Sequence, residues 1–197
     1  IIVNLGTPDG PDEESIRRFL KQFLSDPRVV DFPRWLWLPI LNGIILKSRP
    51  KRLVEDYSSI WGESAGPIVE ITFSLAKKLQ TVLPSEIKVI TAMTYGNPSI
   101  NDAMKEAKGF DHIMVLPMFP QYAGATTGAV EDQINASKHE LSVNKPIRVI
   151  RDYHDEPSYI KAVSNTIRDP ERFLNIDSQL VFSFHGIPQS QSKRGDP

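Results

Sequence analysis

The chain has 197 residues, of which 40% are hydrophobic and 24% charged, so it holds enough apolar material for one or two packed cores. Lysine and arginine together number 23 against 24 for aspartate and glutamate, and this balance gives no basic field that would favour nucleic acid as a partner. Cysteine is absent, which excludes disulfides, thiolate catalysis and cysteine-ligated metal centres within these residues.

Apolar runs of strand length alternate with amphipathic stretches of helical length along the chain. The runs cover 1–5, 86–94, 112–117, 146–151 and 178–184. This alternation is typical of parallel βα units and predicts an α/β fold. Between the first two runs, apolar residues recur at three- and four-residue spacing and predict a helix with one buried face: Ile16, Phe19, Leu20, Phe23 and Leu24.

The segment 32–47 is apolar almost all round and has Pro39 in its middle. Its composition by itself favours a buried core helix that the proline kinks. The alternative is an apolar lid over a ligand, or a patch that rests on a membrane surface. Composition does not separate these alternatives.

The middle of the chain carries further helix and turn signals. Ser99 and Asp102 fit a capping box, which predicts a helix directly after the second strand. The stretch 124–128 leads into the next predicted helix; its backbone N–H groups could bind an anion, although an ordinary glycine-rich turn fits the same pattern better. The polar stretch 142–146 precedes another strand, and we place a domain boundary there.

Ligands of open parallel sheets bind outside the carboxyl ends of the strands. Four of these ends join glycine or proline to an apolar or aromatic side chain, at 4–8, 94–98, 117–122 and 184–188. This composition suits a flat, apolar ligand better than a phosphate. Neither a dinucleotide-binding glycine motif after a strand nor a phosphate-binding P-loop is present in the sequence.

Among the four histidines, His185 is the most informative, because it would emerge at the carboxyl end of the strand predicted over 178–184. His112 and His139 lie among charged residues. His154 stands beside two acidic residues before a predicted helix, a pattern more typical of helix capping than of a metal site.

Together these segments resemble the N-terminal part of ferrochelatases, the enzymes that insert ferrous iron into a porphyrin at the end of haem synthesis. The matching motifs occur in family order over nearly the whole chain, at 3–8, 19–26, 95–99, 116–122, 183–188 and 194–197. In detail the chain looks most similar to bacterial enzymes of the protoporphyrin type. Because it begins with Ile1 rather than methionine, we expect it to be part of a longer protein.

The resemblance implies a chelatase-like α/β fold of two Rossmann-like parallel-sheet domains flanked by helices, with the porphyrin held between them. Residues 1–145 would form the first domain, in which 32–47 is a lip over the porphyrin mouth rather than a core helix. Residues 146–197 would open a second domain, incomplete in this chain, that carries the catalytic histidine. The family's partner glutamate would lie beyond Pro197.

The resemblance also implies roles for particular residues. The catalytic histidine falls on His185, which would act as a base for the pyrrole protons, as a transient iron ligand, or as both. The residues expected to contact the macrocycle are Leu5, Tyr95, Met118 and Tyr122. Leu5 stands where some relatives have tyrosine or methionine, and because leucine cannot ligate iron we expect no ligation from that side.

Expectations on cofactors and partners follow. Relatives with an iron–sulfur cluster place a cysteine in the segment that matches 123–127, and this chain has none there, so we expect no cluster and no tightly bound cofactor. The expected partners are protoporphyrin and Fe²⁺, with no nucleic acid, in a cytoplasmic lyase that contacts a membrane peripherally through 32–47. The alternatives are coproporphyrin or another tetrapyrrole as substrate, and a tetrapyrrole-binding module without catalysis.

Overall fold

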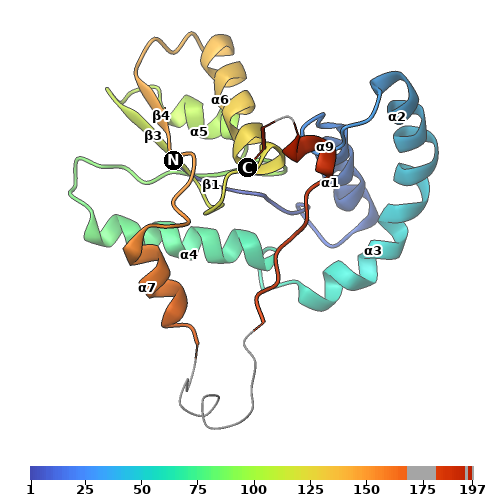
Figure 1. Cartoon of the computed structure of the whole chain (residues 1–197), viewed down its shortest axis with the longest axis horizontal. Helices are drawn as coiled ribbons and strands as arrows, with labels where there is room; N and C mark the ends of the chain where they lie inside the picture. The colour runs from blue at the N-terminus through green and yellow to red at the C-terminus, as the bar shows by residue number, and fades with distance from the viewer. Residues whose placement is uncertain (168–180, 194, 197) are drawn as a thin grey trace.

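The computed structural model describes residues 1–167, 181–193 and 195–196, and the α/β fold class is confirmed (Figure 1). Its elements in chain order are β1 (Ile2–Asn4), α1 (Glu13–Ser25), α2 (Arg34–Ile40), the π-helical turn η1 (Leu41–Ile45), α3 (Leu46–Ile60), α4 (Pro67–Val82), β2 (Thr91–Met93), α5 (Ile100–Ala107), β3 (Ile113–Pro117), the π-helical turn η2 (Gly124–Gly128), α6 (Ala129–Glu140), β4 (Ile147–Val149), α7 (Pro157–Ser164) and α9 (Gln189–Ser192).

The strands form one parallel sheet in the order β2-β1-β3-β4. Side chains alternate between its faces along β1. Val3 is fully buried in a core cluster with residues of α5 and α6, whereas the neighbouring Asn4 donates from Nδ2 to Thr72 Oγ1 of α4 at 3.0 Å. Helices α5 and α6 therefore cover one face of the sheet and α4 covers the other, as Figure 1 shows.

Helices α1 and α5 form as predicted, and the predicted start of α5 is confirmed. Asp12 caps α1 by accepting hydrogen bonds from the N–H groups of Glu14 and Ser15, and the predicted apolar face of α1 packs into the core. The Ser99 hydroxyl caps α5 by accepting from the Asp102 N–H at 3.1 Å. The start of α5 depends on residues within one turn, which is why the sequence predicts it well.

Two predictions about strands need correction. Of the run 178–184, residues 178–180 lie outside the described residues and 181–184 have no regular structure, with Val181, Phe182 and Phe184 at 78%, 67% and 70% exposed. The prediction of a strand there is wrong for 181–184, because a strand needs a neighbouring edge and none of the described strands pairs with it. The run 86–94 forms a strand only from Thr91 onward.

Strand β4 lies after the domain boundary that the sequence predicts at 145–146. It pairs in parallel with β3, with Ile113 opposite Ile147, and this makes it the edge strand of the described sheet. The boundary and the division of the protein into two domains stay predictions.

The lip, residues 32–47, folds as α2, η1 and the start of α3 and packs on α1. Leu41 and Leu46 are buried, and Trp37 Nε1 donates to the Leu24 carbonyl at 2.7 Å. Trp35 and Ile44 point outward and are 76% and 63% exposed. The segment therefore packs through one side only and is not a fully buried core helix, and its role as a lip over a porphyrin stays a prediction. Within the described residues, no helix combines the length and the apolar character that crossing a bilayer requires.

Candidate active site

The loops that follow β1, β2 and β3 meet at the carboxyl edge of the sheet. Tyr95 donates its N–H to the Leu5 carbonyl at 2.9 Å, and Met118 donates its N–H to the Val3 carbonyl at 2.7 Å. Because β1 lies between β2 and β3, these bonds place Leu5 between Tyr95 and Met118. The sequence motifs at three strand ends thus come together in one place.

Two glycines allow the first two of these loops to touch. Gly6 has a φ of +99°, and a Cβ atom there would lie 1.7 Å from the Tyr95 carbonyl oxygen. Gly96 has a φ of +85°, and a Cβ atom there would lie 2.5 Å from the Thr7 carbonyl oxygen. Only a residue without a side chain fits at either position, since the backbone conformation and the space both exclude Cβ.

Tyr95 is a core residue of the site rather than an exposed contact. Its ring is 1% exposed and packs edge-on against Phe23 of α1, with the ring centroids 5.1 Å apart. Its hydroxyl donates to Asp26 Oδ2 at 2.8 Å, and Asp26 Oδ1 accepts from the Arg28 N–H. The expected contact between Tyr95 and a porphyrin stays a prediction, and in this structure the ring has almost no free surface for it.

Replacing Tyr95 by phenylalanine should lower the free energy of unfolding by about 2 kcal/mol, because the hydrogen bond to the Asp26 carboxylate is lost. Burial and the bond to Asp26 raise the pKa of the Tyr95 hydroxyl above its ordinary value of 10.0. The unfolded chain therefore loses this proton at lower pH than the folded chain. The contribution of this hydroxyl to the free energy of unfolding then falls as the pH rises above 10.0. Denaturant unfolding from pH 8 to 11 should show a shallower decline in Tyr95→Phe.

The control for this experiment is Tyr159→Phe on α7, whose ring contacts Tyr153. A decline above pH 10.0 that is as steep in Tyr95→Phe as in the wild type would contradict the assignment. A loss of stability equal to that of Tyr159→Phe would do so as well.

Met118 and Tyr122 belong to the loop between β3 and α6 and are half-buried. The Arg151 guanidinium lies over the Tyr122 ring, 4.3 Å from its centroid. Tyr122 also lines a cavity of about 310 Å³ together with residues from the loop after α1, from η2 and from the C-terminal segment: Pro27, Arg28, Asp31, Gly124, Gln191, Gly195 and Asp196. Together with half-buried Leu5, these two residues are the predicted contacts that keep surface at the carboxyl edge, whereas Tyr95 is buried.

The glycine-rich turn 124–128 forms η2 and leads into α6. Its first N–H group, on Gly124, donates to Asp196 Oδ2 at 2.7 Å. The turn thus does bind an anionic group, and that group is a carboxylate of the chain itself. Sequence reasoning missed Asp196, Asp26 and Arg28 as parts of this region, although the quoted motifs contain the two aspartates.

His185 lies in the irregular segment before α9 and is exposed. Its Nδ1 atom is 2.7 Å from the carbonyl oxygen of Gly186, its own neighbour. Among the described residues, no hydrogen bond or ion pair joins the imidazole to the four predicted contact residues. The roles of His185 and of these four residues therefore stay predictions.

Two other features lie apart from these residues. A larger cavity, of about 820 Å³, opens at the amino edge of the sheet beside Ile1 and Ile113, and none of the predicted site residues lines it.

A small cluster of possible metal ligands lies elsewhere, at Asp152, His154 and Asp155, whose ligand atoms are within 4.8 Å of one another. All three residues are exposed, and exposed acidic groups commonly gather without a metal.

A parallel sheet with helices on both faces, and with loops at its carboxyl edge of the kind that bind ligands in such folds, defines a Rossmann-like α/β protein. The family model "Ferrochelatase" matches residues 1–197, so the chain belongs to the ferrochelatase family. It is 42% identical over 203 residues to a ferrochelatase of Nitrosomonas europaea, 43% over 204 residues to one of Psychrobacter cryohalolentis, and 42% over 198 residues to one of Vibrio parahaemolyticus.

All of this chain is covered in each of these comparisons, against 56%, 60% and 61% of the relatives. The chain therefore spans somewhat more than half the length of the curated relatives that it matches.

Proposed function

We propose that the protein is a ferrochelatase, a lyase that inserts Fe²⁺ into protoporphyrin to form haem. The observation that carries the proposal is the match of the ferrochelatase family model to the whole chain. The fold supports it, because apolar and aromatic side chains gather at the carboxyl edge of the sheet, where an α/β protein binds its ligand. Porphyrin and ferrous iron are the substrates.

The chemistry gives the predicted residues distinct tasks. Two pyrrole protons must leave the ring as the metal enters, so a neutral imidazole at His185 would accept a proton, bind the metal briefly, or do both. Half-buried Met118 and Tyr122, with Leu5 between the loops, offer apolar contact to the macrocycle. Leu5 has no ligand atom for iron. A cysteine-ligated cluster has no ligands within residues 1–197, so we propose no cofactor for this part of the protein.

The decisive experiment is metal insertion by the full-length protein. Purified protein is mixed with protoporphyrin and Fe²⁺ or Zn²⁺, and the absorbance change of the metalloporphyrin is followed, with coproporphyrin assayed in parallel. We expect turnover with protoporphyrin to be the faster. Binding of porphyrin without metal insertion would contradict the proposal and indicate a tetrapyrrole-binding module without catalysis. Faster turnover of coproporphyrin would show that coproporphyrin, and not protoporphyrin, is the preferred substrate.

The lip supports a second part of the proposal, peripheral contact with a membrane from the cytoplasmic side. Trp35 and Ile44 expose apolar side chains, and four exposed basic residues follow at the start of α3: Lys47, Arg49, Lys51 and Arg52. An apolar surface beside basic residues suits the interface of an anionic bilayer.

Replacing Trp35 and Ile44 together by serine should weaken binding to vesicles of phosphatidylcholine and phosphatidylglycerol at least about 10-fold, because two apolar side chains are lost from the interface. The matched control replaces Ile71 and Val82 of α4, which are 67% and 76% exposed, by serine. Cosedimentation measures the binding. Equal weakening in both double variants would show that the lip has no special part in it.

A further inference from the structure

The chain that follows His185 returns to the carboxyl edge of the sheet and is bound there at two points. We call α9 together with Gly195 and Asp196 the anchor segment. Asp196 Oδ2 accepts the hydrogen bond from the Gly124 N–H at 2.7 Å. Gln191, which is 9% exposed, directs Nε2 toward the Arg28 carbonyl at 3.4 Å. The first bond is short and charge-assisted, so it is the stronger of the two.

Backbone hydrogen bonds join the two points of attachment to each other. The Asp196 N–H donates to the Gln191 carbonyl at 3.2 Å, and the Gly195 N–H donates to the Ser192 carbonyl at 3.0 Å. Gly195 has a φ of +94°, a conformation that closes the turn after a helix and favours glycine. Release of Asp196 from Gly124 would therefore loosen α9 as well.

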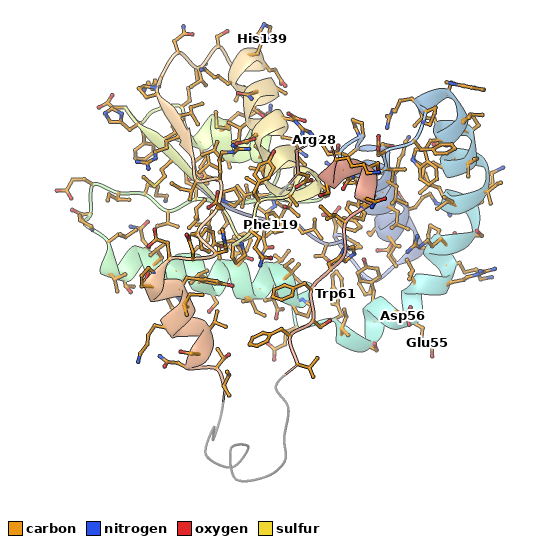
Figure 2. All side chains as sticks on the ribbon, in the orientation of Figure 1. Arg28, Glu55, Asp56, Trp61, Phe119 and His139 are labelled. Carbon is orange, nitrogen blue, oxygen red and sulfur yellow. The ribbon has the colours of Figure 1, made fainter. Side chains whose placement is uncertain are left out.

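The surface that receives the anchor segment is itself fixed. The Arg28 guanidinium binds the Asp132 carboxylate of α6 through two hydrogen bonds, of 2.7 and 3.0 Å. The Arg28 N–H donates to Asp26 Oδ1 at 2.8 Å. Figure 2 shows Arg28 beside α9, where α1 and α6 approach each other. The anchor segment thus rests on groups that the core of the sheet domain holds in place.

The backbone N–H of Gly124 and the space beside this residue both suit the Asp196 carboxylate. Its N–H begins a helical turn, where anionic groups are favoured. A Cβ atom at Gly124 would lie 3.0 Å from Asp196 Oδ2, so a side chain there would push the carboxylate back by a few tenths of an ångström. Gly124 also ends the loop that carries Met118 and Tyr122, which ties the anchor segment to two of the predicted porphyrin contacts.

The chain between His185 and the anchor segment is short. Three residues, 186–188, separate His185 from α9, and even a fully extended chain keeps the His185 Cα within about 14 Å of the Gln189 Cα. Pro188 has a fixed φ, here −59°, and its carbonyl accepts the Gln191 N–H at 2.8 Å. Holding α9 therefore limits how far His185 can move from the anchor segment, although the imidazole itself is exposed.

We propose that Asp196 is a positioning residue for His185. By holding the anchor segment on Gly124, it keeps the imidazole near the loop that carries Met118 and Tyr122. The carboxylate does not touch the reacting atoms; it acts through the chain that leads back to His185. This inference rests on the proposed function, because positioning of His185 affects a rate only if His185 takes part in metal insertion.

The experiment compares four forms of the full-length protein: wild type, Asp196→Ala, Asp196→Asn and Ser192→Ala. Ser192 lies on α9 and is exposed, so its alanine variant is the matched control. Asparagine keeps an oxygen that accepts the Gly124 N–H. For each form we measure kcat and KM for Zn²⁺ insertion into protoporphyrin, and hydrogen exchange of the peptides that contain 124 and 181–188.

Asp196→Ala should lower kcat at least 10-fold and leave KM for the porphyrin within twofold, with exchange of both peptides at least 10-fold faster. Asp196→Asn should stay within threefold of the wild type in kcat. The inference is overturned if Asp196→Ala loses no more activity than Ser192→Ala, or if asparagine fails to restore kcat. If the wild type inserts no metal, the proposed function fails. Hydrogen exchange then still tests the anchor: exchange of 181–188 that is slower in the wild type than in Asp196→Ala shows that Asp196 holds the segment of His185, and equal exchange shows that it does not.

Discussion

Replacing His185 by alanine in the full-length protein should lower the rate of metal insertion into protoporphyrin about 10²- to 10⁴-fold. This is the usual loss when a positioned general base or acid is removed. Folding should be unaffected within about 0.5 kcal/mol, because the side chain is exposed and bonds only to its neighbour's carbonyl among the described residues. Steady-state absorbance assays with Zn²⁺ measure the rate, and thermal unfolding measures the stability.

The matched control is His139→Ala. His139 is exposed at the end of α6 that lies farther from Arg28 (Figure 2), so its loss should change the rate less than twofold. An undiminished rate in His185→Ala would remove His185 from the mechanism. If free imidazole partly restores the rate of His185→Ala, the lost chemistry is that of the ring. If the rate is lost and free imidazole does not restore it, the substitution has instead disturbed the position of the segment that carries His185.

Replacing Gly6 by alanine should destabilise the protein by about 3 kcal/mol or more. The residue has a φ of +99°, which costs a side chain roughly 1–3 kcal/mol, and the added Cβ would overlap the Tyr95 carbonyl oxygen at 1.7 Å. The β1 and β2 loops would have to separate, which breaks the bond from the Tyr95 N–H to the Leu5 carbonyl. Denaturant unfolding measures the loss.

Gly109→Ala is the control, because a Cβ atom at Gly109 would meet nothing within 4 Å. This variant should stay within about 1 kcal/mol of the wild type. If Gly6→Ala were as stable as Gly109→Ala, the close contact of the two loops would not be a requirement of the fold. Because the loops carry Leu5 and Tyr95, a destabilised Gly6→Ala should also insert metal more slowly.

Local patterns predicted much of the first domain. The buried face of α1 and the cap of α5 at Ser99 both depend on residues within a few positions of one another, so the sequence alone is enough to predict them. The carboxyl-edge loops were predicted by the same kind of evidence, since glycine and proline punctuate the ends of apolar runs. The order of the motifs then indicated the family, which the family model confirms.

Tyr95 shows where this evidence stops. The resemblance implied a porphyrin contact for Tyr95, which stays a prediction, whereas the structure buries its ring and joins its hydroxyl to Asp26, 69 residues away in the chain. Nothing near Tyr95 in the sequence specifies that partner. The approach depends on how the end of α1 packs against the carboxyl edge, and that is a property of the assembled fold.

The lip shows the same limit in another way. Its residues are apolar on nearly every side, so hydrophobic spacing could not say which of them face the core. Packing against α1 selects Leu41 and Leu46 for burial and leaves Trp35 and Ile44 outside. The resemblance to the family predicted a lip, and the structure supplies the physical distinction between its two sides.

The sequence by itself determined the α/β class, the loops at the strand ends, the exclusion of cysteine chemistry within residues 1–197, and the family. Tertiary structure decided that β4 joins the first sheet, that Tyr95 is buried on Asp26, and that Asp196 fills the glycine-rich turn at Gly124. Helix periodicity and caps act over one or two turns, whereas strand pairing and a carboxylate bound 72 residues away depend on which surfaces meet.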